Sequence, residues 1–106
     1  MRIIFDQGTP VPLRRFLNIH QVETVFEGGW SRLKNGELLA RGEEEGFEVF
    51  VTTDKNLSKQ QNLSSRKMAI VVLSSTSWPR IQAAVDSINQ AIETTLPGSL
   101  HEVRIP

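Results

Sequence analysis

Three acidic residues lie close to the expected ends of buried strands or the start of a helix, and together they have the chemistry of a metal site. Asp6 follows an apolar run at 3–5, Asp54 follows a second at 49–53, and Glu37 lies in the first turn of an expected helix. Carboxylates held close together repel one another, and a divalent cation such as Mg²⁺ relieves that repulsion through oxygen ligands. A cation held this way can activate water and stabilise charge on phosphate, so the pattern is compatible with metal-assisted phosphodiester cleavage.

Each of these acids also has a structural explanation. Asp6 precedes Gly8 and Pro10 and is a typical turn residue, whose side chain bonds nearby amides. Glu37 complements the dipole at the start of its helix, and Asp54 is placed to cap a following turn. The functional interpretation therefore depends on the three side chains meeting in space.

The hydrophobic pattern predicts the elements that would bring them together. Apolar runs predict strands at 3–5, 21–25, 47–51, 69–73 and 101–105. Helical spacing of apolar residues predicts a short helix at 13–17, with Phe16 on its apolar face, and a helix at 36–45 with Asn35 as its cap and Gly46 at its end. A third, continuous helix is expected from residue 77 to the turn at Pro97.

Strands that alternate with helices favour right-handed crossovers, which give a three-layer α/β/α sandwich with a mostly parallel central sheet. Ligands of such sheets bind beyond the carboxyl ends of the strands. Asp6 and Asp54 are therefore expected at the edge of the sheet formed by these carboxyl ends, the carboxyl rim, and Glu37 is expected to point toward this rim.

Composition narrows the class of protein. A length of 106 residues predicts a single domain over 1–106, and 39% hydrophobic with 23% charged residues is typical of a globular chain. A net charge of zero means that any nucleic-acid binding must come from a local patch, and the lack of cysteine excludes disulfides, thiolate zinc sites and cysteine nucleophiles. No apolar run approaches the length of a membrane span, which favours a cytoplasmic protein without membrane contact.

The segments around the three acids resemble the PIN-like family. Asp6 after a first strand, Asn-Gly-Glu-Leu at 35–38 opening a helix, and Thr-Thr-Asp-Lys-Asn at 52–56 after a central strand carry this resemblance over nearly the whole chain. Within this family, the chain resembles the short bacterial PIN-like proteins described as toxin components. The resemblance implies an Mg²⁺- or Mn²⁺-dependent ribonuclease, with RNA as substrate, an antitoxin protein as partner, and Asp6, Glu37 and Asp54 as catalytic metal ligands.

The chain departs from the family at one point. PIN nucleases commonly supply a fourth acid downstream of the third, but the next acid here is Asp86, inside an expected helix, and the loop at 74–77 supplies hydroxyls. Hydroxyls bring no charge and lower the affinity for a metal ion. The alternative is therefore a PIN-like module with weak or no catalysis that binds RNA or a partner protein.

Polar residues after the third acid are candidates for phosphate contacts. These are Lys55, Asn56, Lys59 and Arg66, and the competing interpretation is an ordinary solvated loop. A homodimer is also expected, because the edges of a small parallel sheet need to be covered.

A phosphoacceptor receiver domain is the remaining alternative, with Asp54 as the phosphorylated residue. It requires two acids after the first strand and a lysine after the last, where this chain has Gln7 beside Asp6 and an arginine, Arg104.

Overall fold

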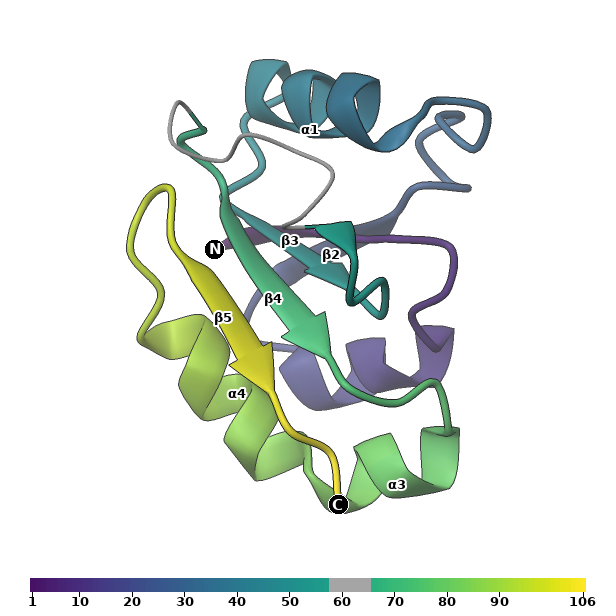
Figure 1. Ribbon diagram of the computed structural model, residues 1–106, viewed down its shortest axis with the longest axis vertical. Helices are drawn as coiled ribbons and strands as arrows, with labels where there is room; N and C mark the ends of the chain where they lie inside the picture. Colours follow the sequence, from purple (N-terminus) through teal and green to yellow (C-terminus); the bar gives the residue numbers. More distant parts are fainter. Residues whose placement is uncertain (58–65) are drawn as a thin grey trace.

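The computed structural model describes residues 1–57 and 66–106. In this part of the chain, five parallel strands form one sheet in the order β2-β1-β3-β4-β5 (Figure 1). The strands are β1 (Arg2–Phe5), β2 (Gln21–Thr24), β3 (Val49–Thr52), β4 (Ala69–Leu73) and β5 (Leu100–Val103). The expected α/β architecture with a parallel sheet is confirmed.

Helices cover both faces of this sheet (Figure 1). One face packs against α1 (Asn35–Glu44). The opposite face packs against a 3-10 helix, η1 (Val11–Leu17), and against α3 (Trp78–Ala83) and α4 (Val85–Glu93). The layers are those of an α/β/α sandwich.

Alternating residues of the strands divide the core into two clusters. In β1, Ile3 and Phe5 pack on the η1 side with Leu13, whereas Ile4 packs on the α1 side with Leu39. Every residue of β3 and β4 is buried. A parallel strand covered on both faces needs apolar side chains in both directions, which explains why these runs show no alternation.

Three expectations about the helices need correction. The continuous helix from residue 77 is interrupted at Ala84, which has φ −111° and ψ 15°; α3 packs on η1, and α4 packs on both β5 and η1. The helix α1 begins at Asn35 after an N-cap at Lys34 that makes no side-chain cap bond. Phe16 is 39% exposed, because the tighter 3-10 geometry turns it away from the core; its ring packs at a tilt of 47° against Trp78, with 5.8 Å between the two ring centroids.

The strand order places a crevice between β1 and β3. Here β2 is added on one side of β1, and β3, β4 and β5 are added on the other side. Flavodoxin-like sheets share this order and bind ligands at the same switch point, although topology alone does not define function. Phe5 pairs with Val51, and the backbone N–H of Asp6 donates to the carbonyl of Val51 at 2.9 Å. The carboxyl ends of the two strands are therefore in register at the crevice.

Among residues 1–57 and 66–106, no helix is both long enough and apolar enough to cross a bilayer.

Candidate functional site

The Thr52 side chain joins two of the predicted acids at the carboxyl rim. Its hydroxyl, fully buried at the end of β3, donates to Asp6 Oδ2 at 2.8 Å. The same oxygen accepts the backbone N–H of Asp54 at 3.0 Å. Asp6 and Asp54 are thus linked through one side chain on neighbouring strands, as the sequence predicts for acids at one rim.

Backbone amides fix both carboxylates. Asp6 Oδ1 accepts the N–H of Gln7 at 2.8 Å, and Asp54 Oδ1 accepts the N–H of Asn56 at 2.9 Å. Both acids therefore also serve in local turns, which was the structural alternative for each. Both are half-buried, and a carboxylate oxygen that accepts one hydrogen bond keeps a further lone pair for a cation.

At the start of α1, Asn35 and not Glu37 contacts the pair of acids Asp6 and Asp54. The amide Nδ2 of Asn35 donates to Asp54 Oδ2 at 3.3 Å, whereas Glu37 is exposed in the first turn of the helix. Among the described residues, no three His, Cys, Asp or Glu side chains are grouped to hold a metal ion. The three predicted acids therefore do not form a common cluster, and the residue of α1 that bonds Asp54 is Asn35.

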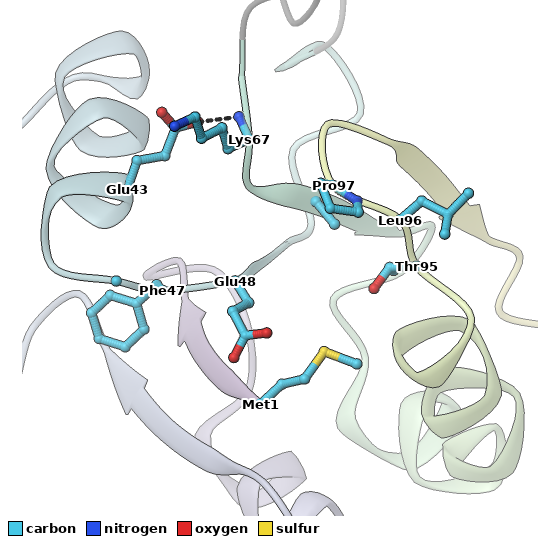
Figure 2. A pocket seen from close by; sticks show the side chains of 10 residues that line it. Met1, Glu43, Phe47, Glu48, Lys67, Thr95, Leu96 and Pro97 are labelled. Carbon is cyan, nitrogen blue, oxygen red and sulfur yellow. Dashed lines mark hydrogen bonds between the residues drawn. The ribbon is translucent and has the colours of Figure 1, made fainter.

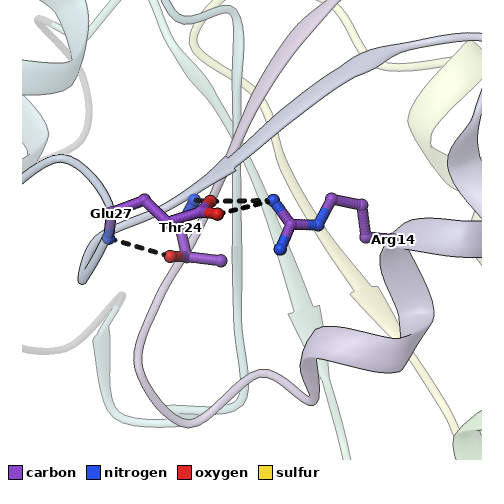
Figure 3. A network of polar contacts seen from close by, with 3 residues as sticks. All are labelled: Arg14, Thr24 and Glu27. Carbon is purple, nitrogen blue, oxygen red and sulfur yellow. Dashed lines mark hydrogen bonds and ion pairs between the residues drawn. The ribbon is translucent and has the colours of Figure 1, made fainter.

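A cavity of about 520 Å³ opens on the β1–β2 side of Asp6. It is lined by Gln7, Thr9, Val11, Arg14, Thr24, Phe26 and Glu27 in addition to Asp6. Figure 3 shows its central polar contacts: Arg14 Nη1 donates to Glu27 Oε1 at 2.8 Å and to Oε2 at 3.0 Å. The side-chain hydrogen bond from Arg14 lowers the pKa of Glu27, and the backbone N–H of Thr24 lowers it further.

The residues that follow β2 form a single capped helical turn. Thr24 N–H donates to Glu27 Oε1 and Glu27 N–H donates to Thr24 Oγ1, each at 3.0 Å, which is a capping box (Figure 3). At the other end, Gly29 has φ +78° and Trp30 N–H donates to the carbonyl of Val25, which is a Schellman ending. The turn holds Glu27 in place at the mouth of the cavity.

A second cavity, of about 540 Å³, lies on the β4–β5 side of the rim. Lys55, Ser74, Glu102, Arg104 and Ile105 line it. Lys55 and Arg104 are both exposed, and the Ser74 hydroxyl accepts the N–H of Ile105 at 2.7 Å. Two cations against one acid make this side of the rim suited to phosphate.

The other residues predicted to contact nucleic acid have different surroundings. Asn56 is exposed beside Asp54, and its N–H bonds that carboxylate. Arg66 is half-buried, and its Nη2 donates to the carbonyl of Gly36 in α1 at 3.4 Å. Lys59 lies outside the described residues. Lys55 is therefore the predicted cation that the structure places in a cavity at the rim.

A third cavity, of about 390 Å³, lies at the amino edge of the sheet (Figure 2). Figure 2 shows Glu43 of α1 beside Lys67, whose backbone N–H donates to Glu43 Oε1 at 2.8 Å, with Leu96 on the opposite wall. It lies at the end of the strands opposite to Asp6 and Asp54. Since parallel sheets gather their ligands at the carboxyl edge, we assign no function to it.

We compared the chain with protein-family models, curated proteins and solved structures, and none of them matches it.

Sequence reasoning missed several residues of the rim. In the sequence Thr52 stands out only as part of a motif, although its hydroxyl organises both acids. The site residues predicted from the sequence do not include Arg14, Phe26 and Glu27. The Thr-x-x-Glu spacing at 24–27 was a usable signal for the capped turn, because it is the pattern of a capping box.

Proposed function

We propose that this chain is a metal-dependent ribonuclease of the PIN-like type, with Mg²⁺ or Mn²⁺ held by Asp6 and Asp54. The observation that supports it best is the hydrogen-bonded link from Asp6 through Thr52 to Asp54 at the point where the strand order reverses. Two pre-positioned carboxylates suit Mg²⁺, which is commonly bound through one or two carboxylates and keeps several waters. When bound, the cation would supply a water of lowered pKa and stabilise charge on the phosphate.

The protein's own contribution is to position the ligands and the RNA. The backbone N–H groups of Gln7 and Asn56 and the hydroxyl of Thr52 orient the two carboxylates. Lys55 and Arg104, in the β4–β5 cavity, attract the phosphates of the strand without reading its sequence. Glu37, exposed on α1, has no direct share in holding the cation in this proposal.

Paired titrations and cleavage assays test the proposal. Isothermal titration with Mn²⁺ should show binding to the wild type, and single-stranded RNA should be cleaved only with the metal present. Asp6→Asn and Asp54→Asn should lose both, while Asp86→Asn, which alters an exposed acid on α4, should retain both. Metal-dependent cleavage that persists in Asp6→Asn would exclude the assigned site.

A second candidate function is a PIN-like module that binds RNA or a partner protein without efficient cleavage. The pairing of Asn35 with Asp54, where a third carboxylate was expected, favours it. RNA binding by wild type that survives chelation of metal, together with no cleavage, would select this alternative.

The PIN-like resemblance is the basis for proposing a toxin role and an antitoxin partner, and the cytoplasmic location stays a prediction from the composition of the chain. A neighbouring gene for a small DNA-binding protein that co-purifies with this chain and blocks cleavage would support it. The homodimer stays a prediction that analytical ultracentrifugation would test.

A further inference from the structure

The cavity beside Asp6 combines an exposed aromatic ring with fixed polar groups. Phe26 is 78% exposed at its mouth, and Val11, 50% exposed, supplies a second apolar surface. The volume of about 520 Å³ lies within the roughly 300–1,000 Å³ of small-ligand sites. An aromatic side chain left in water at the mouth of a cavity is a surface on which a flat ring can stack.

The backbone holds Phe26 in place before any ligand arrives. Phe26 lies inside the turn that the capping box closes at Thr24 and that Gly29 ends with its positive φ. The carbonyl of Phe26 accepts the N–H of Gly29 at 3.1 Å. The backbone of Phe26 is therefore already ordered, and a ring that stacks on its side chain costs no further backbone entropy.

The charges of this cavity decide which part of a nucleotide it accepts. Asp6 and Glu27 bring two carboxylates, and Arg14 brings one guanidinium whose Nη1 is already paired with Glu27. An excess of negative charge disfavours a phosphate, and a neutral ring carries no such penalty. The cations that suit phosphate lie across the rim, in the cavity of Lys55 and Arg104.

We propose that the cavity between η1 and the turn after β2 binds a nucleobase of single-stranded RNA, stacked on Phe26, while the adjoining backbone passes Asp6 toward Lys55. This subsite rests on the proposed ribonuclease function, because it shares Asp6 with the proposed metal site. The subsite adds a stacking contact to the base, which the metal-binding carboxylates of Asp6 and Asp54 cannot make.

Fluorescence anisotropy with two labelled probes tests the subsite. One probe is a short oligoriboadenylate, and the other has the same sugar–phosphate backbone without bases; Ca²⁺ replaces Mg²⁺ so that the strand stays intact. Phe26→Ala should weaken binding of the first probe about 10-fold or more, since base stacking on an aromatic ring contributes that much. Phe26→Trp should bind within a few-fold of wild type.

Ile19→Ala is the matched control, because Ile19 is 72% exposed near β2 but does not line the cavity. It should leave binding unchanged, and the probe without bases should bind Phe26→Ala and wild type alike. The proposal is overturned if Phe26→Ala binds the oligoriboadenylate like wild type, if both probes lose affinity equally, or if wild type binds neither. If wild type does not cleave RNA in the presence of Mg²⁺ but Phe26→Ala still weakens binding of the oligoriboadenylate, the ribonuclease proposal is refuted and the base subsite is retained.

Discussion

The hydroxyl of Thr52 donates to Asp6 Oδ2 at 2.8 Å and so connects the ends of two neighbouring strands. The same oxygen accepts the N–H of Asp54, so one buried side chain sets the position of both acids. This link depends on the pairing of β1 with β3, because Phe5 and Val51 bring the two strand ends level. The site is therefore a product of sheet register more than of local sequence.

Thr52→Val should test that link directly. Valine keeps the shape and removes the hydroxyl, which leaves the N–H of Asp54 without its partner, and we expect a loss of about 1–3 kcal/mol in the free energy of unfolding. Urea denaturation measures this loss, and amide hydrogen exchange at Asp54 should become faster. Thr52→Ser keeps the hydroxyl and should keep slow exchange at Asp54. Equal exchange rates in the valine and serine variants would contradict the assigned role.

Gly8 and Thr53 should show strong coupling. A Cβ added at Gly8 would lie 2.6 Å from Thr53 Oγ1, so Gly8→Ala should destabilise the protein by about 1–3 kcal/mol through overpacking. In a Thr53→Ala background the same change should be nearly neutral or stabilise by up to about 1 kcal/mol. A double-mutant cycle by urea denaturation measures the coupling, and strictly additive effects would show that the contact is not the cause.

Glu37 and Asp54 should differ in their effect on metal binding. Asp54→Asn removes a proposed ligand and should abolish Mn²⁺ binding in titration calorimetry. Glu37→Gln should reduce it no more than Glu44→Gln, a control on the same helix, because the acids at 6, 37 and 54 do not form one group. A loss of affinity in Glu37→Gln as large as in Asp54→Asn would place Glu37 at the cation after all.

The sequence predicted the sheet well because buried parallel strands leave a strong local signal. The run 69–73 matches β4 in both bounds, and Asp6 and Asp54 were placed correctly after their strands. Gly46, expected at the end of α1, has φ +84° there, a conformation that glycine adopts without strain.

Two features of the structure could not be predicted from the sequence, because they depend on contacts between distant segments. The break at Ala84 is invisible in the apolar spacing, since Ile81 and Ile88 continue one helical pattern across it. Likewise, the choice of Asn35 over Glu37 as the neighbour of Asp54 depends on how α1 is rotated against β3. Helix rotation is set by packing of the α1 face, which spacing alone does not resolve to one residue.

The ion pair of Arg14 and Glu27 should make stability depend on pH in the acidic range. The hydrogen bond from Arg14 is the main cause that lowers the pKa of Glu27 from its ordinary value of 4.5, so the folded state binds a proton less readily than the unfolded state. The resulting stabilisation is present above pH 4.5 and is lost as the pH falls through the lower pKa of the folded state.

Thermal unfolding of wild type and Glu27→Gln over a range of pH measures this effect. Glutamine keeps an oxygen for the N–H of Thr24 but removes the charge that faces Arg14. Wild type should have the higher Tm at neutral pH, and the difference should shrink toward zero below pH 4.5. Glu44→Gln, on exposed α1 surface, controls for the loss of one negative charge. A Tm difference between wild type and Glu27→Gln that stays constant across this range would show that the charge of Glu27 contributes nothing, and that the turn is held by its backbone bonds alone.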